Sequence, residues 1–316
     1  QHWHPCGVSG CNISDHQSAK ENHNWTPKTD PSTDEVINEC SECGAMKGVC
    51  GDFVIAWGEY GTDYSYDRAG RTLTILSSNP LKISGTTKSD KIVIAQNVTA
   101  NITLENVYID VSGTYYACAF DVAGSAVCNL TLKGQNTLKS GQARAGLRVP
   151  GTETQTAKLI ISEDPNTGGS LSAFGGDNGA GIGGGDNQKG GTIIINSGTV
   201  TAQGHNGGAG IGGSRGKDGG VIEINGGTVN ATADGGYWCS FAGAGIGGGG
   251  CYNNSNDTAG SGGQITINGG IVTATSKKNG AGIGSGASGS ESNSANGGTI
   301  LITGGTVTAT SGRYES

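Results

Sequence analysis

Residues 191–204 read GTIIINSGTVTAQG, and the pattern recurs as GVIEINGGTVNATA at 220–233, GQITINGGIVTATS at 263–276 and GTILITGGTVTATS at 298–311. The four copies align without a gap. A second unit, GAGIGGG or a close variant, precedes each copy and starts at Gly179, Gly208, Gly243 and Gly280. Such self-similarity is typical of proteins in which each repeat packs on the next. Each repeat is therefore expected to contain three short strands.

Apolar residues alternate with polar ones within each strand. Ile193 and Ile195 share one parity, and the matched positions of the later copies also hold isoleucine. Alternation predicts strands with one buried face. Val200 and Ala202 in the second strand, and Ala180 with Ile182 in the third, repeat the pattern. We therefore predict an all-β fold, a parallel β-helix of about seven or eight coils with three strands each, whose coiling is right-handed because parallel crossovers strongly prefer that hand.

Corners and loops can be placed from the same alignment. Glycine supplies 61 of the 316 residues and flanks the strands, where it permits backbone turns with positive φ. Asn196, Asn225 and Asn268 recur at one corner and are expected to form a side-chain ladder. The repeats start 29, 43 and 35 residues apart, and the variation falls in residues 234–242, 251–262 and 288–296, which we interpret as loops.

Two domains are expected. Weaker strand patterns extend upstream through KLIIS, KIVIA and TLTIL, so the β-helix is predicted to occupy residues 51–316 and a cap residues 1–50. The chain ends on an ordinary repeat, which would leave an open strand edge. We therefore expect the β-helix to continue in a longer protein, or further domains or a subunit to cover its C-terminal coil.

The bulk composition excludes several partners. The formal net charge is −7 without any Lys/Arg cluster, so neither nucleic acid nor an anionic membrane surface is an expected partner. No apolar run approaches the roughly 20 residues that span a bilayer, so membrane insertion is not expected. The chain begins at Gln1 and contains one methionine. Together with the abundance of Ser, Thr, Asn and Gly, this favours a secreted or cell-surface location.

The first 50 residues concentrate five of the nine cysteines and four of the five histidines. The spacing of a C-x4-C pair and a later C-x2-C pair suits a closed, structural zinc site, in which a histidine could replace one thiolate. A disulfide knot that includes Cys50 is the alternative. Two further pairs, Cys118/Cys128 and Cys239/Cys251, are either loop-closing disulfides or buried thiols. The predicted zinc ligands are Cys6, Cys11, Cys40, Cys43, His4 and His23.

The repeated GAGIGGG and GGTVTAT units, preceded by DYSYDRAGRTLTIL and AGLRVP, resemble repeat modules of secreted surface proteins of gut Firmicutes. The front segment, HWHPC to ECSECGA, is similar to the Cys/His modules often attached to such proteins. The resemblance covers nearly the whole chain. It implies a β-helix on a cell surface, loosely described as adhesin-like or carbohydrate-binding, and it carries over no catalytic residues.

The first functional hypothesis is an extracellular solenoid acting as an adhesin or as a module that binds or presents carbohydrate. Its partner would be a glycan or another host or cell-surface ligand. Aromatic side chains gather in the insertions of a chain that is otherwise poor in them, and the apolar faces of sugars stack on such rings. A local cover over the core is the alternative. The predicted ligand-binding residues are Tyr237, Trp238, Phe241 and Tyr252.

Two other functions are compatible with parts of the sequence. A polysaccharide lyase or glycoside hydrolase would need converging carboxylates or a carboxylate set holding calcium, and the candidates are Asp177, Asp186 and Glu223. Asp177 and Asp186 flank one GAGIGGG unit and are expected at opposite ends of a strand. An ice-binding array would use the outward threonines of the second strand, although Asn230 and Ile271 interrupt it.

Overall fold

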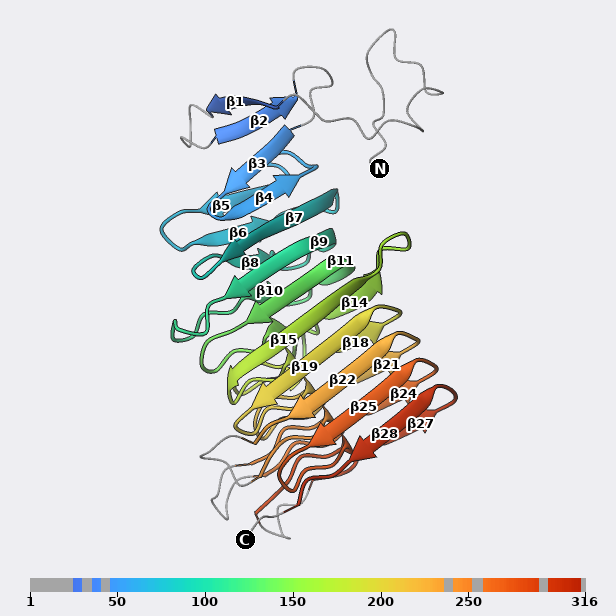
Figure 1. Cartoon of the computed structure of the whole chain (residues 1–316). Coiled ribbons are helices and arrows are strands. Elements are labelled where there is room, and N and C mark those ends of the chain that lie inside the picture. Colours follow the sequence, from blue (N-terminus) through green and yellow to red (C-terminus); the bar gives the residue numbers. More distant parts are fainter. Residues whose placement is uncertain are drawn as a thin grey trace.

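The computed structural model describes residues 25–29, 36–40, 46–235, 241–251, 258–289 and 295–313. These ranges contain strands and turns, and none of their segments is a helix long and apolar enough to cross a membrane. Figure 1 shows the strands stacked one below another from β1 to β28. The fold is therefore all-β, as the alternation in the sequence predicts.

The coils are built on two long sheets of parallel strands. One sheet holds the short third strands, which are β6 (Thr72–Ile75), β8 (Lys91–Ile94), β10 (Phe120–Val122), β12 (Leu147–Arg148), β16 (Ile182–Gly183), β20 (Ile211–Gly212), β23 (Ile246–Gly247) and β26 (Ile283–Gly284). Each of them pairs in parallel with its counterpart in the next coil. The described residues thus complete eight coils, at the upper end of the expected number.

The other sheet holds two strand positions per coil. In the first three coils they merge into β7 (Pro80–Thr87), β9 (Thr99–Asp110) and β11 (Val127–Lys139), whose ladders shift register at the bend. In the later coils they separate into β14 (Lys158–Glu163), β15 (Gly169–Asp177), β18 (Thr192–Ile195), β19 (Thr199–His205), β21 (Val221–Ile224), β22 (Thr228–Ala233), β24 (Gln264–Ile267), β25 (Ile271–Ser276), β27 (Thr299–Ile302) and β28 (Thr306–Thr310). A small antiparallel pair, β13 (Pro150–Gly151) with β17 (Lys189–Gly190), lies outside both sheets.

Antiparallel strands cover the N-terminal end of the stack. They are β1 (Trp25–Thr29), β2 (Val36–Cys40), β3 (Met46–Cys50), β4 (Phe53–Ala56) and β5 (Tyr64–Asp67). Strand β4 pairs antiparallel with β7, and β5 with β6. Parallel pairing begins only at β6 and β7. Residues 51–71, which the sequence placed in the β-helix, therefore pair as part of the antiparallel cover.

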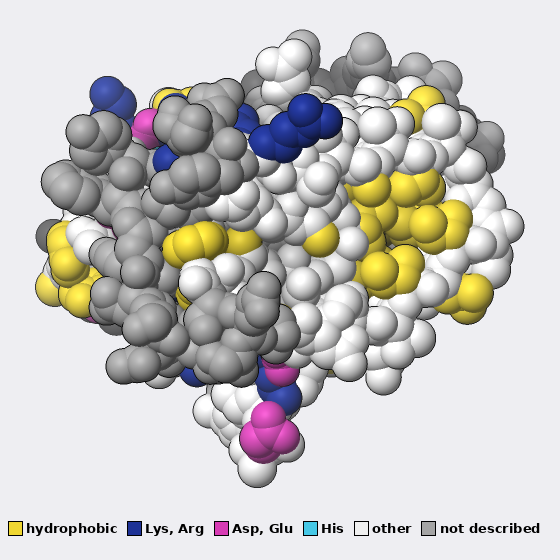
Figure 2. Space-filling model, turned by 90° about the horizontal axis from the view of Figure 1, so that it is seen from below, with side chains coloured by type: hydrophobic (Ala, Val, Ile, Leu, Met, Phe, Trp, Pro, Cys, Tyr) yellow, Lys and Arg dark blue, Asp and Glu magenta, His cyan; other side chains and the backbone are white. Residues whose placement is uncertain are grey.

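The interior is the predicted apolar column. Matched residues stack in register, with Ile193 on Ile222 and Ile222 on Ile265, and each is at most 1% exposed. In the last coil the equivalent Ile300 is 42% exposed, because none of the described residues packs beneath it. Figure 2, viewed from that end, shows hydrophobic side chains gathered on this face. The inward direction of the isoleucines is thus confirmed, and only the last coil leaves them accessible.

Glycine is required at one position of every late coil. Gly183, Gly212, Gly247 and Gly284 each follow the isoleucine of the short strand and adopt φ values of 133° to 137°. Side chains rarely tolerate this conformation. A Cβ atom on Gly212 would also overlap the carbonyl oxygen of Gly247 in the next coil. This glycine column lets the backbones of successive coils meet directly.

The expected asparagine ladder is present. Asn225 donates from Nδ2 to Asn196 Oδ1 at 3.0 Å, and Asn268 donates to Asn225 Oδ1 at 2.8 Å. In the last coil Thr303 takes the same position and donates its hydroxyl to Asn268 Oδ1 at 2.8 Å. The ladder holds one corner in register across four coils.

Candidate functional site

One corner of the solenoid carries chemically distinctive side chains in six consecutive coils. It is the corner where the chain leaves β9, β11, β15, β19, β22 and β25 and turns toward the next short strand. We call these side chains the corner row: the Tyr115–Tyr116 pair, Arg144, Asp177, His205, Asp234 and Lys277. The row runs along the solenoid axis because each member comes from a different coil.

The row begins with two exposed tyrosines in the loop between β9 and β10. Tyr115 is 60% and Tyr116 53% exposed, and the rings meet edge to face with centroids 4.4 Å apart. A hydrogen bond between the phenols and the charge of Tyr116 raise the pKa of Tyr115, and the nearby carboxylates Asp177 and Asp186 raise it further. These two rings therefore offer water-facing aromatic surface beside polar groups.

Arg144, in the next coil, orders the tyrosine pair. Its guanidinium carbon lies 5.4 Å from the centre of the Tyr116 ring, and its Nε donates to the Tyr116 carbonyl oxygen at 3.2 Å. Cation–π contact and a hydrogen bond to the same residue hold the ring in one place. Tyr116 itself has φ of 60°, a conformation uncommon outside glycine and asparagine. The loop backbone therefore turns sharply at Tyr116, whose side chain is more than half exposed.

Asp177 and Asp186 lie on either side of the short strand β16, and the backbones of both bond to Ala143 of the preceding coil. The Ala143 amide donates to the Asp177 carbonyl oxygen at 2.9 Å, and the Asp186 amide donates to the Ala143 carbonyl oxygen at 2.9 Å. The GAGIGGG unit turns back on itself between them, which brings the two ends of this segment close. The Ala180 amide bonds the Gly184 carbonyl oxygen at 3.1 Å, which closes a tight turn.

His205 lies between two carboxylates from neighbouring coils. Its Nε2 is 3.4 Å from Asp177 Oδ1, and its Nδ1 is 4.0 Å from Asp234 Oδ2. Lys277 continues the row with its Nζ 2.8 Å from Asp234 Oδ1. Asp177 also accepts a hydrogen bond from Asn206 Nδ2 at 2.7 Å. The imidazole and both carboxylates remain between 27% and 39% exposed, so a ligand could reach them.

The third predicted catalytic candidate lies elsewhere. Glu223 is in the middle of β21, facing outward between Ile194 and Thr266 of the adjacent coils. It therefore lies on the first of the two strand positions that each coil gives to this sheet. The corner row follows the second position, so Glu223 does not join its carboxylates. The outward threonines of the second strand do align, as Thr199 on Thr228, but Ile271 follows them in that column and is 56% exposed.

Most of the other predicted site residues lie outside the described residues. Among the proposed ligand-binding aromatics only Phe241 is described, and its half-buried ring lies against Gly289. Of the proposed zinc ligands, Cys40 ends strand β2. In the part of the chain that the structure describes, no three His, Cys, Asp or Glu side chains form a metal-binding group. The predicted site residues that lie outside the described ranges are Tyr237, Trp238, Tyr252, Cys6, Cys11, Cys43, His4 and His23.

Cys118 and Cys128 are buried free thiols, which is the second of the two alternatives for this pair. Burial raises the pKa of Cys118 to about 12, and burial also raises that of Cys128. Both thiols therefore stay protonated and unreactive at neutral pH.

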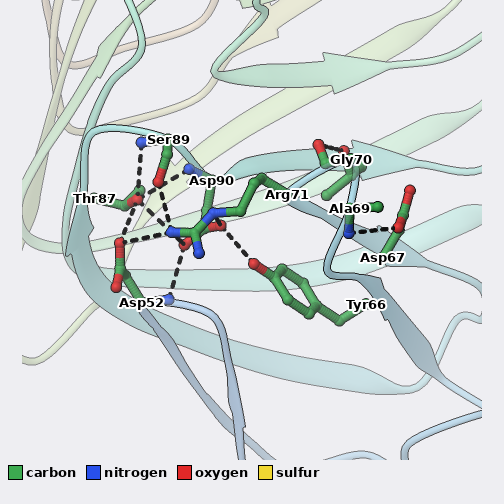
Figure 3. Close-up of polar contacts among 10 residues, drawn as sticks. Asp52, Tyr66, Asp67, Ala69, Gly70, Arg71, Thr87, Ser89 and Asp90 are labelled. Carbon is green, nitrogen blue, oxygen red and sulfur yellow. Dashed lines mark hydrogen bonds and ion pairs between the residues drawn. The ribbon is translucent and has the colours of Figure 1, made fainter. Parts of the chain in front are cut away.

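A second polar cluster, shown in Figure 3, joins the antiparallel cover to the first coil. Asp90 is fully buried, accepts the Tyr66 hydroxyl at 2.6 Å and the Asp52 amide at 2.8 Å, and pairs with Arg71 Nε at 2.8 Å. Thr87 donates to Asp52 Oδ2 at 2.8 Å. Burial, and then the hydrogen bond to Asp90, raise the pKa of Tyr66. We call Asp52, Tyr66, Arg71, Thr87 and Asp90 the cap latch. Because its charged groups pair with one another, we assign it a structural role.

Sequence reasoning missed the tyrosine pair and His205. Two adjacent tyrosines in the glycine-flanked SGTYYAC segment, and the only histidine beyond residue 50, were signals available in the sequence. Neither residue belongs to the repeated pattern. A search for repeats therefore passes over both.

Coils stacked through two sheets of parallel strands define a parallel β-helix. The family model described as a beta helix repeat matches residues 193–215, 222–250, 265–287 and 300–314. The chain is similar to that family over its four regular repeats. Neither the curated proteins nor the solved structures contain a match to this chain.

Proposed function

We propose that this chain is an extracellular surface solenoid that acts as an adhesin or carbohydrate-binding module, and that it binds sugar at the Tyr115–Tyr116 pair. The observation that carries the proposal is the pair itself, with both rings more than half exposed and one of them fixed by Arg144. An ordered ring loses little conformational freedom when a ligand packs on it. The apolar face of a sugar ring would cover this surface.

The polar groups around the pair suit the hydroxyls of a sugar. Asp177 and Asp186 are near enough to act on the Tyr115 phenol electrostatically, and carboxylates accept hydrogen bonds from hydroxyls. Arg144 supplies guanidinium donors. Aromatic surface with donors and acceptors at its border is the composition expected of a site for a neutral, hydroxyl-rich ligand.

Glycan-array binding by the protein and its variants tests this proposal. Tyr116→Ala and Tyr115→Ala should each lower the signal at least about tenfold, which corresponds to roughly 1.4 kcal/mol of binding free energy. Tyr116→Phe should retain binding because it keeps the ring. Ile271→Ala is the matched control, since it removes an equally exposed hydrophobic side chain at the start of β25, several coils away from the tyrosine pair. Glycan binding that survives both tyrosine substitutions would contradict the assignment of the site.

A polysaccharide hydrolase is the second candidate, and the position of His205 between two carboxylates favours it. Asp177 and Asp234 belong to coils two steps apart, so their backbones are separated by two strand spacings, about 9.5 Å. Inverting hydrolases separate their carboxyl groups by about 6.5–9.5 Å. Release of reducing ends from neutral polysaccharides, abolished by Asp234→Asn, would establish this activity. Binding without release would leave the chain a binding module.

A further inference from the structure

The corner row repeats at the spacing of the coils. Asp177 pairs in register with His205, and Asp234 and Lys277 each follow the last paired residue of their strands. Neighbouring members of the row are therefore about 4.8 Å apart along the axis, which is the separation of hydrogen-bonded strands. One sugar residue of an extended glycan chain has nearly this length. Each coil of the row can consequently face one sugar residue of such a chain.

Side chains of both charges occur along the row. Arg144 and Lys277 contribute positive charge, whereas Asp177 and Asp234 contribute negative charge, with His205 between them. Asp186 adds another carboxylate near the start of the row, where its amide donates to the Ala143 carbonyl oxygen and its charge acts on the Tyr115 phenol. A polyanionic glycan would meet repulsion at each of these carboxylates. An uncharged chain would find donors and acceptors at every coil.

We propose that the corner row binds one linear, uncharged polysaccharide parallel to the solenoid axis, with one sugar residue on each coil and one end stacked on the tyrosine pair. This inference rests on the proposed sugar site at Tyr115 and Tyr116. It adds the orientation of the ligand, its extended form and its lack of charge. Affinity then depends on how many coils the ligand spans.

Calorimetric titration with neutral β-1,4-linked glucose and mannose oligomers, from the disaccharide to the octasaccharide, tests this proposal. The dissociation constant should fall with each added sugar residue, by about tenfold or more in total, and level off once the row is filled. Asp234→Ala and Lys277→Ala should weaken the hexasaccharide several-fold and leave the disaccharide unchanged. Tyr116→Ala should weaken every oligomer.

Glu223→Ala is the matched control for Asp234→Ala, because it removes an outward carboxylate from the same coil away from the row. Thermal unfolding of each variant checks that the fold is kept. A hexasaccharide that binds no tighter than the disaccharide would overturn the axial arrangement while leaving the tyrosine site in place. Tighter binding of oligogalacturonates than of neutral oligomers would overturn the assigned ligand class. Binding of no oligomer at all would overturn the proposed function itself.

Discussion

Individual carboxylates in this protein are stabilised in their charged form by local hydrogen bonds. Asp63 is 3% exposed, and it accepts Ser77 Oγ at 2.6 Å, Asn79 Nδ2 at 2.8 Å and the Glu59 amide at 2.7 Å. Burial alone would raise the pKa of Asp63, but the three hydrogen bonds outweigh it and lower that pKa below its ordinary value. The loop that precedes the first coil is therefore organised around one anion.

This arrangement predicts acid sensitivity. A carboxyl group with a lowered folded-state pKa stabilises the protein above its unfolded pKa of about 3.9 and loses that contribution as the pH falls through the folded value. We expect the free energy of unfolding to drop below about pH 4. Asp63→Asn should lower the free energy of unfolding by about 1–3 kcal/mol at pH 7 and reduce its further fall at acid pH. Urea unfolding at a series of pH values measures both effects, and an unchanged fall at acid pH in the variant would contradict this role.

At the scale of elements, the cap latch binds the antiparallel cover to the solenoid. Its residues come from the start of β4, from β5, from the turn before β6 and from the end of β7, and all of them converge on buried Asp90. Gly51 packs so closely on Asp90 and Tyr66 that an added Cβ would overlap both side chains. One carboxylate thus organises four segments.

Removing the Asp90 carboxylate should strongly lower the stability of the fold. Asp90→Ala leaves Arg71 and Tyr66 without their main partner, and breaking a buried ion pair typically costs about 3–5 kcal/mol. We expect a lower Tm and faster amide hydrogen exchange in β4 and β5, with β18 to β25 little changed. Asp67→Ala is the control, because Asp67 is exposed and bonds only a nearby amide among the described contacts. Equal effects of the two substitutions would show that the latch contributes nothing specific.

The elements differ in how far the sequence predicts them. Strands β18 to β28 follow from four aligned copies, and so do their inward isoleucines and the asparagine ladder, because stacking places identical residues at identical positions. The merged strands β7, β9 and β11 and the antiparallel cover do not follow from the alignment, since their sequences are degenerate. The turn that brings the Asp186 backbone close to that of Asp177 does not follow from the sequence, because a turn within a glycine run leaves no side-chain signal. The tyrosine pair occurs once and so has no copy to compare.

The whole molecule is a one-dimensional stack in which each coil packs mainly on its two neighbours. Val221 and Gln264 occupy the same register position in consecutive coils, as do Ile222 and Ile265. Removing one full coil should consequently bring equivalent residues into contact. The ladder would then pair Asn196 with Asn268.

Deletion of residues 222–264 tests this modularity. The shortened chain should remain folded and β-rich by circular dichroism, with a smaller urea m value because less surface is exposed on unfolding. Deletion of residues 222–265 is the control, since one further residue turns the strand's apolar side chains to the opposite face. The control should aggregate or unfold at lower temperature. Similar stability of the two deletions would contradict strict register between coils.

The glycine column also determines where this protein can vary. At that seam, main chain lies on main chain, so nineteen of the twenty amino acids are sterically penalised in every late coil. A saturation mutagenesis map should accordingly show a narrow band of intolerance that returns once per turn, while the corner bearing the tyrosines accepts most replacements without loss of folding. New specificities would therefore arise at the corner that bears the tyrosines, while the glycine column keeps the spacing of the coils unchanged.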